Sequence, residues 1–346
     1  MKQLTSEPKN ILVINVSRIG DTLLVTPALR ALAQKWPQAK ITFLGHPNRA
    51  EIIENIPFVS MVGKITKLRA IWRGWFGGQP YDLALVYHTD EALITYALRI
   101  AKHVVAFRQK NAKLNDRLFN CPDTPPFQTM HAAEIPLLLT RSIGAPDAGR
   151  QLSYTVARQE DEWARETLQH IKRPLIGLQV ASFPTKAYRD WPIEYFETLC
   201  ERILERWPDA HFLIFGGTLE KDRTDALAKR LGRHATLFAG TLTLRQSAAL
   251  MNLVDLYIGV DTGPTHIMGA LHKPMIALYH CYSPSRVLAP LEHPCCYIID
   301  HPRVGQEDCG PEASMSEISV DVVWAKVVEA FATHHPHATP VSSFEK

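Results

Sequence analysis

Two polar segments carry residue types that could do chemistry, and each follows a short apolar run. In the first, residues 17–22 (SRIGDT), an acid comes soon after the run 11–16 (ILVINV). Asp21 could cap the helix that begins there by accepting backbone N–H groups, or its carboxylate could face a ligand cleft and act as a general base. The two roles compete, because a carboxylate held by helix amides is acidified and becomes a weaker base. The residues alone favour the cap.

The second segment, residues 259–266 (GVDTGPTH), ends an apolar run and opens a stretch with helical spacing. Thr262 and Gly263 follow Asp261, and their backbone N–H groups would point out of the positive end of a helix. Such a helix end is an anion site, well suited to a diphosphate. His266 lies one turn further and could serve the same site. A buried packing histidine and a helix with a purely structural cap are the alternatives.

Two further loops offer groups for a phosphorylated ligand. Residues 181–192 follow another apolar run and contain Lys186 and Arg189, which could neutralise phosphate oxygens or could simply be solvated. Residues 215–220 (FGGTLE) place two glycines where a flat ligand could approach the backbone closely. Glu220 could accept hydrogen bonds from a ribose, or could only begin a helix.

The charge of the chain is divided unevenly. Residues 1–150 hold 19 Lys and Arg against 11 Asp and Glu, a net charge of +8, whereas the remainder holds 19 against 24, a net charge of −5. The basic part is therefore biased toward an anionic partner. Trp72, Trp75 and Phe76 lie among its cations, a combination that suits a membrane surface or an anionic glycolipid and, with such a moderate charge, suits nucleic acid less well. A solvated face around a core tryptophan is the simpler alternative.

The six cysteines are too sparse for a disulfide scaffold. Four of them fall in one short stretch: Cys281, Cys295, Cys296 and Cys309. Their spacing is irregular, whereas zinc sites normally show C-x₂₋₄-C pairs. We therefore expect buried free thiols here and no bound metal.

Alternating strand-like and helical stretches must position these segments. Strands are expected at 11–16, 40–44, 82–87, 103–107, 175–180, 211–215, 236–239, 256–260 and 275–279. Helices are expected at 21–36, 48–55, 91–101, 129–142, 159–171, 193–207, 220–231, 244–253, 262–271 and 320–331. This order predicts an α/β protein with mostly parallel sheets. The rhythm breaks at 108–150, so we predict two Rossmann-like domains, 1–150 and 151–346, which bind ligands at strand carboxyl ends in the crevice between them.

Several common catalytic signatures are missing from the sequence. It contains no G-x-G-x-x-G, no G-x-x-x-x-G-K-[ST] and no G-x-S-x-G. It also lacks D-x-D, the usual cradle for a divalent ion on a sugar nucleotide. Because no apolar run is long enough to span a bilayer and the start has no signal core, we expect a cytoplasmic protein.

Three segments together resemble glycosyltransferase family 9, the bacterial ADP-heptose:lipopolysaccharide heptosyltransferases. They are ILVINVSRIGDTLLVTPALRAL near the start, TKAYRDWPIEYF in the middle and GVDTGPTHIMGALHKPMIALY late in the chain. The resemblance covers about residues 10–330. It implies a GT-B fold, in which an N-terminal acceptor-binding domain and a C-terminal nucleotide-sugar-binding domain face a central cleft. The last helix can then pack back on the first domain.

The resemblance also implies an enzyme that inverts the transferred sugar and uses neither a metal nor a cofactor. It would transfer heptose from ADP-heptose to the inner core of lipopolysaccharide, in peripheral contact with the cytoplasmic face of a Gram-negative inner membrane. By position Asp21 corresponds to the base, and the acceptor-binding candidates are Arg18, Arg69 and Arg73. The donor-binding candidates are Ser182, Lys186, Arg189, Glu220, Asp261, Thr262, Gly263 and His266. Many relatives have a lysine where this chain has Arg189, so either Arg189 or Lys186 would hold the phosphates.

Other interpretations stay open. A sugar-nucleotide epimerase shares the two-domain plan but acts without an acceptor. A glycosyltransferase that uses a different nucleotide sugar would share the motifs as well. A non-enzymatic nucleotide-binding protein and a nucleic-acid binder fit the intact Asp21 and residues 261–266 less well.

Overall fold

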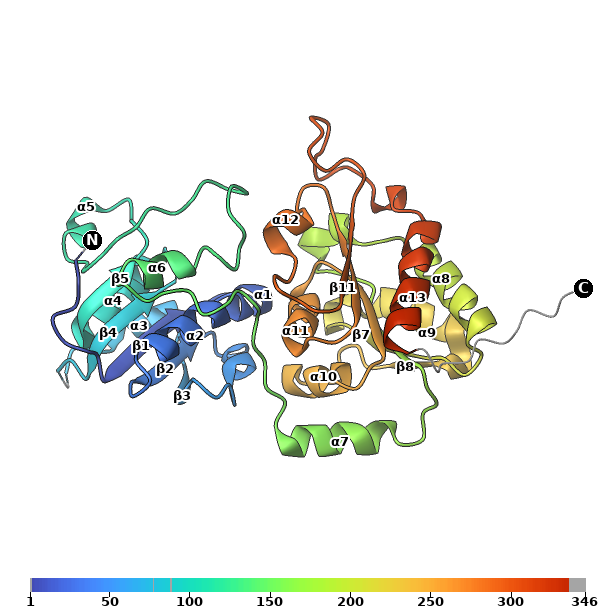
Figure 1. The fold of residues 1–346 in the computed structure, drawn as a ribbon, viewed down its shortest axis with the longest axis horizontal. Helices are drawn as coiled ribbons and strands as arrows, with labels where there is room; N and C mark the ends of the chain where they lie inside the picture. Colours follow the sequence, from blue (N-terminus) through green and yellow to red (C-terminus); the bar gives the residue numbers. More distant parts are fainter. Residues whose placement is uncertain (1, 77, 88, 336–346) are drawn as a thin grey trace, which may run out of the picture. The chain divides into compact units, whose positions relative to one another are not determined.

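The structure, a computed structural model, describes residues 2–76, 78–87 and 89–335 (Figure 1). The chain divides into unit 1, Met1–Thr155, and unit 2, Val156–Lys346. The predicted boundary at 150/151 falls in the extended segment that ends unit 1.

Unit 1 is built on one parallel sheet with the strand order β3-β2-β1-β4-β5. Its strands are β1 (Asn10–Asn15), β2 (Lys40–Gly45), β3 (Met61–Lys64), β4 (Tyr81–Val86) and β5 (Ala101–Ala106). Its helices are α1 (Ile19–Leu23), α2 (Thr26–Lys35), η1 (Ala50–Ile53), α3 (Lys67–Trp72), α4 (Glu91–Ile100), α5 (Ala112–Asn115) and α6 (Leu137–Arg141). Because the strands are parallel, their carboxyl ends meet at one edge, and α1 begins there.

Both faces of this sheet are buried, which explains the continuous apolar runs in its central strands. Successive side chains of a strand point to opposite faces. Ile11 and Val13 accordingly pack in a cluster with α2, and Leu12 and Ile14 pack in another with α3 and α4. The central strand is thereby fixed, and so is the segment that carries Asp21 beyond its end.

Unit 2 has a parallel sheet with the strand order β11-β10-β9-β6-β7-β8. Its strands are β6 (Leu175–Gln179), β7 (His211–Phe215), β8 (Ala235–Leu237), β9 (Leu256–Val260), β10 (Met275–Tyr279) and β11 (Cys296–Asp300). Its helices are α7 (Arg158–Leu168), η2 (Pro184–Arg189), α8 (Ile193–Arg206), η3 (Thr218–Glu220), α9 (Lys221–Leu231), η4 (Gly232–His234), α10 (Leu244–Met251), α11 (Gly263–Leu271), α12 (Ser285–Leu288), η5 (Met315–Glu317) and α13 (Val320–His334).

The strand order of unit 2 reverses direction beside β6. From β6 the chain builds outward through β7 and β8, and it then returns to place β9 on the other side of β6. Ligands of such sheets bind at this switch point, outside the carboxyl ends of the strands. The loops after β6 and β9 are those that hold the predicted donor-binding residues.

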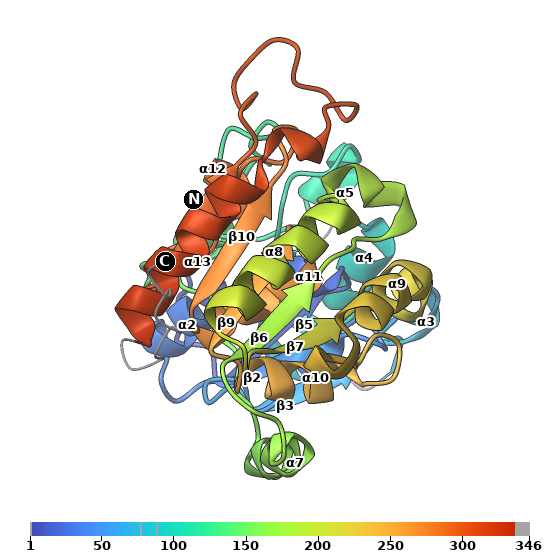
Figure 2. The same ribbon diagram turned by 90° about the vertical axis from the view of Figure 1, so that its right-hand side faces the viewer.

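The last helix packs within unit 2. Figure 2 shows α8 and α13 side by side across one face of the sheet. Val323, Val327 and Phe331 of α13 join the buried cluster that contains Trp207 and Ile276.

Some predicted elements differ from the observed ones. The helix expected at 21–36 is two helices, α1 and α2, because Pro27 lies in the first turn of α2 and cannot continue the preceding turn. The helix expected at 129–142 is reduced to α6, which begins after Pro136. The strands β3 and β11 and the helix α3 were not predicted at all.

None of the helices in the described part of the chain has the length and apolar content needed to cross a membrane.

Candidate functional site

Asp21 is the third residue of α1 and does not cap it. The residue at the cap position is Arg18, and no side chain caps this helix end. The Asp21 side chain is exposed, and its carboxylate forms no hydrogen bond or ion pair with the residues that the structure describes. The capping interpretation of Asp21 is therefore wrong, and its carboxylate is available to a ligand.

Two hydrogen bonds fix the backbone of the turn that carries Asp21. The side-chain amide of Asn15, the last residue of β1, donates to the backbone carbonyl of Asp21 at 2.9 Å. The hydroxyl of Thr22 donates to the carbonyl of Arg18 at 2.7 Å. Both bonds hold the backbone and leave the carboxylate free, an arrangement that suits a base with a fixed position.

The predicted acceptor-binding arginines belong to unit 1 and are all exposed. Arg18 immediately precedes α1, whereas Arg69 lies on α3 and Arg73 follows it. The strand before α3 ends at Lys64, which pairs with Gly45, and Gly45 pairs in turn with Asn15. Since parallel strands end at one edge, the start of α3 and the start of α1 share the carboxyl edge of this sheet.

In unit 2, α11 begins as the sequence predicts. Thr262 has extended backbone angles and precedes Gly263, the first residue of the helix. No side chain caps this helix end, because the Thr262 hydroxyl lies 3.3 Å from that of Thr265 instead. The first-turn amides are therefore not neutralised by a side-chain oxygen, which makes this end of α11 suitable for an anion.

An ion pair joins the loop after β6 to the start of α11. Arg189 Nη1 lies 2.6 Å from the buried carboxylate of Asp261, and Nη2 donates to the hydroxyl of Ser283 at 2.9 Å. His266 Nε2 lies 3.6 Å from the other carboxylate oxygen of Asp261. The predicted residues Arg189, Asp261 and His266 are thus brought together, while Ser283 was not predicted.

The loop between β6 and η2 is held by a second network. Asp190 Oδ1 accepts hydrogen bonds from the backbone N–H of Ser182 at 2.7 Å and from its hydroxyl at 2.6 Å. Arg223 of α9 forms an ion pair with Asp190 and donates to the Ser182 carbonyl at 2.9 Å. The Ser182 hydroxyl also lies 2.7 Å from the carbonyl of Lys186. Ser182 thus orders the loop, and its role in donor binding stays a prediction.

Lys186 and Arg189 differ in whether a carboxylate already pairs with their charge. The Lys186 ammonium is partly exposed, lies 5.6 Å from the centre of the Tyr188 ring and has no carboxylate partner in the described part of the chain. Arg189 is committed to Asp261. Tyr188 lies near both cations. Burial raises the pKa of its phenol, but hydrogen bonds with Ser283 and Arg189 and the two nearby positive charges outweigh burial, so the pKa is lowered.

Glu220 is buried at the start of α9. One of its carboxylate oxygens accepts the backbone N–H of Gly217 at 2.7 Å, a bond that closes the start of η3, whereas its side chain does not cap α9. The predicted bond from a ribose to its other carboxylate oxygen stays a prediction.

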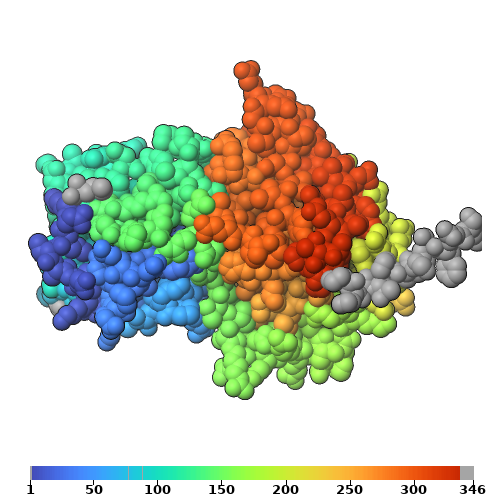
Figure 3. Space-filling model, viewed as in Figure 1, coloured from blue at the N-terminus to red at the C-terminus, as the bar shows by residue number. Residues whose placement is uncertain are grey.

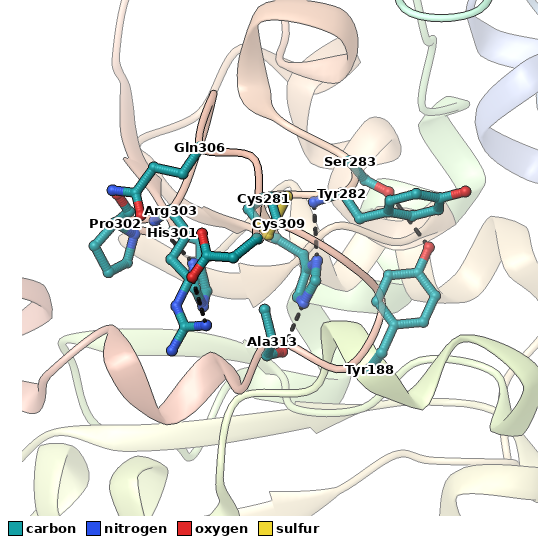
Figure 4. Close-up of a disulfide and its surroundings, with 12 residues drawn as sticks. Tyr188, Cys281, Tyr282, Ser283, His301, Pro302, Arg303, Gln306, Cys309 and Ala313 are labelled. Atoms are coloured by element: carbon teal, nitrogen blue, oxygen red, sulfur yellow. Dashed lines mark hydrogen bonds and ion pairs between the residues drawn. A yellow bond between two sulfur atoms is a disulfide. The ribbon is translucent and has the colours of Figure 1, made fainter.

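Two cysteines of the predicted thiol group form a disulfide, Cys281–Cys309 (Figure 4). The expectation of free thiols is therefore wrong for this pair, whereas Cys295 and Cys296 are unpaired. Burial raises the pKa of the Cys296 thiol to about 12, so this thiol stays protonated. Across the residues that the structure describes, no three His, Cys, Asp or Glu side chains gather as metal ligands.

The disulfide was missed because its two cysteines lie 28 residues apart in sequence. The chain between them forms α12 and β11 and then a loop that projects from the surface of unit 2 (Figures 1 and 3). His280 adds a second tie, since its ring lies 2.8 Å from the carbonyl of Ala313. The segment with Ser283, which contacts Arg189, is thus fastened to that loop.

The chain is similar to known heptosyltransferases. A family model described as glycosyltransferase family 9 (heptosyltransferase) matches residues 70–309. The lipopolysaccharide core heptosyltransferase OpsX of Haemophilus influenzae is 22% identical over 292 residues, which are 83% of this chain and 83% of OpsX.

Solved structures share the fold. The glycosyl transferase family 9 protein of Veillonella parvula has a TM-score of 0.81 at 19% identity, over 96% of this chain and 100% of that one. The ADP-heptose lps heptosyltransferase II of E. coli has a TM-score of 0.76 at 18% identity, over 94% of this chain and 99% of that one. The predicted fold class, two parallel-sheet α/β domains of the GT-B type, is confirmed.

Proposed function

The chain belongs to glycosyltransferase family 9, and we propose that it transfers heptose from ADP-heptose to the inner core of lipopolysaccharide. The observation that carries the proposal is the start of α11 in unit 2, where uncapped helix amides lie beside Arg189 and Asp261. This arrangement suits the diphosphate of a nucleotide sugar. The names of the relatives in Haemophilus influenzae and E. coli supply the sugar and the acceptor.

On the donor side, the proposed chemistry is departure of ADP from the anomeric carbon of the heptose. The leaving diphosphate gains negative charge in the transition state, so fixed positive groups lower the barrier. The amides of Thr262 and Gly263 and the ammonium of Lys186 can supply this stabilisation, which is the work that a divalent ion does in other transferases. We therefore infer a metal-independent transfer, in which Glu220 holds the ribose with its second carboxylate oxygen.

On the acceptor side, Asp21 acts as the general base. Its carboxylate takes the proton of the acceptor hydroxyl as the oxygen attacks the anomeric carbon from the face opposite ADP, which inverts that carbon. Arg18, Arg69 and Arg73 are exposed cations of the same unit and suit the phosphates and carboxylates of an anionic acceptor. His266 lies beside Asp261 and acts with it on the donor side.

A direct assay tests the proposal. The protein is incubated with ADP-heptose and a lipopolysaccharide acceptor that lacks the heptose region, and the mass of the product is measured by mass spectrometry. We expect a mass gain of one heptose and an equal amount of ADP. Conversion of the nucleotide sugar without an acceptor would support the epimerase instead.

A thermal-shift panel tests the nucleotide. A ligand that binds only the folded state at 100 times its dissociation constant stabilises by about 2.7 kcal/mol. We expect ADP to raise the melting temperature more than UDP, GDP or CDP at equal concentration. A larger shift with one of the others would point to a glycosyltransferase with a different donor.

A further inference from the structure

The helix α3 of unit 1 turns an apolar stripe toward solvent. Leu68, Ile71 and Trp72 are spaced as one face of α3, and Trp75 and Phe76 follow its end. Their exposed fractions are 73%, 45%, 80%, 64% and 96% in that order. An amphipathic helix on a soluble protein normally buries this face and exposes its polar one. Here the small residue Ala70, on the opposite side, is the one that is buried.

The stripe is held in place by α4. The Trp75 ring lies 4.4 Å from the guanidinium carbon of Arg99, and its indole N–H donates to the carbonyl of Ile71 at 3.2 Å. Arg99 also donates to the carbonyl of Ala70. Gly74 has φ of +78°, and a Cβ there would come within 2.8 Å of Ile100, so the chain lies tightly on α4 at this turn. The exposed aromatic side chains therefore stand on a fixed support.

Positive charge borders the stripe. Residues 55–81 contain Lys64, Lys67, Arg69 and Arg73 and no acid. Lys67 is paired with Asp90 at 2.7 Å, whereas the other three have no carboxylate partner among the described residues. An apolar strip edged by unpaired cations complements a surface that is apolar inside and anionic at its face.

We propose that α3 and the residues up to Phe76 dock on an anionic lipid bilayer. Trp72 and Phe76 would insert at the level of the headgroups and upper acyl chains, where aromatic rings are favoured, while Lys64 faces lipid phosphates. The proposal rests on the proposed function, because an acceptor built on lipid A is held in a membrane. It goes beyond it by naming the surface that meets the lipid.

The alternatives fit the charges less well. In a symmetric dimer the same patch would face itself, and the cations of one copy would oppose those of the other. Single-stranded nucleic acid would use the rings and cations but would leave the aliphatic part of the stripe, Leu68 and Ile71, without a partner. A lipid bilayer offers an apolar interior for the aliphatic and aromatic side chains and anionic phosphates for the cations.

Vesicle flotation of the full chain, without nucleotide or acceptor, tests the docking. The probes are vesicles of phosphatidylethanolamine with phosphatidylglycerol and cardiolipin, and vesicles of phosphatidylcholine alone. We expect binding to the anionic vesicles that weakens with salt. The double variant Trp72→Ser/Phe76→Ser should bind more than about tenfold more weakly. Lys64→Gln alone should lose roughly fivefold, the share of one cation near an anionic surface.

The matched control is Phe127→Ser, since Phe127 is as exposed as Trp72 and lies in the same unit. Its binding should equal that of the wild type. Equal binding of the double variant and the wild type, or equal binding to both kinds of vesicle, would overturn the proposal. So would a dimer in light scattering that the double variant abolishes, because the stripe would then be covered by a second copy.

Activity separates this proposal from the proposed function. The double variant should keep its rate on a water-soluble, deacylated acceptor and lose rate on acceptor embedded in vesicles. A protein that transfers heptose but does not float would refute the docking and leave the function intact. A protein that floats but transfers no heptose would refute the proposed function and leave the docking intact.

Discussion

Replacing Asp21 with asparagine removes a proton acceptor and changes little else in the structure. The side chain is exposed, the carboxylate has no partner in the described residues, and the bond from Asn15 reaches the backbone carbonyl, which the variant retains. Surface substitutions of this kind usually change stability by no more than about 0.5 kcal/mol. The Asp21→Asn variant should therefore melt as the wild type does.

The rate should fall steeply. A positioned general base contributes about 10²–10⁴-fold, which at 1.36 kcal/mol for each factor of ten is about 3–5 kcal/mol of the barrier. Because Asp21 lies on unit 1 and the residues proposed to bind the diphosphate lie on unit 2, we expect ADP affinity to change less than twofold. The loss should appear in kcat and in kcat/KM alike, the pattern for an interaction made only in the transition state.

The measurements are ADP release with saturating donor and acceptor, and ADP affinity by calorimetry. Asp116→Asn is the matched control, since Asp116 is also an exposed aspartate of unit 1 and should keep full activity. If Asp21→Asn retained kcat within about threefold of the wild type, Asp21 would not be the base. If it lost ADP affinity as strongly as kcat, its role would lie in binding and not in proton transfer.

Three other changes separate binding from stability. Lys186→Ala should raise the KM for the donor by about tenfold or more, the value of one charge-assisted hydrogen bond, with an unchanged melting temperature in a thermal scan. Arg189→Ala should destabilise by about 3 kcal/mol in urea unfolding, because it removes the arginine from the buried Asp261 carboxylate and leaves only His266 beside it, and unfolding equal to that of the wild type would contradict this role. Asp82 has its pKa lowered from 3.8 to about 2, first by the hydrogen bond from Lys102 and then by two backbone amides of β1 and the residue before it. Its stabilisation is therefore present above about pH 4 and is lost as the pH falls toward 2, so Asp82→Asn should cost about 1 kcal/mol at pH 7 and nothing near pH 2, as followed by unfolding at each pH.

The parts of the fold that the sequence predicts are those buried on both sides. The strands β1, β4, β6, β9 and β10 are continuous apolar runs because helices cover both faces of their sheets. The candidate loops with Asp21, Ser182 and Asp261 follow β1, β6 and β9, so their places in the sheets follow from these strands alone. This is why the turn with Asp21 and the start of α11 could be located from the residues.

The elements that were missed have weak or misleading patterns. The strand β3 lies at the sheet edge, contains a glycine and a lysine and is only partly buried. The helix α3 has its apolar residues on the solvent side, so its pattern points away from the core it packs on. An apolar pattern therefore fails to predict burial in the core where the apolar face binds a partner, as we propose for α3.

The contacts that order the site join residues far apart in the sequence. Arg223 appears in the sequence as one more charged residue of a helix, and nothing in its surroundings predicts a bond to Asp190 in the loop after β6. The disulfide between Cys281 and Cys309 is hidden in the same way. Such pairs depend on how the strands are ordered in the sheet, which a single sequence does not determine.

The ion pair between Arg189 and Asp261 gives the loop after β6 a fixed contact with the segment before α11. A guanidinium has five N–H donors in a fixed plane. Arg189 uses them to reach Asp261, the Ser283 hydroxyl at 2.9 Å and the Tyr188 hydroxyl at 3.2 Å at the same time. The three donors of a lysine ammonium are all on one nitrogen, so a lysine could not reach these three partners at the same time. Because Asp261 comes two residues before α11, the arginine ties the loop after β6 to the start of that helix, where we propose that the diphosphate binds. Lys186, three residues earlier, has no carboxylate partner in the described residues, and for this reason we propose it as the cation that binds the diphosphate.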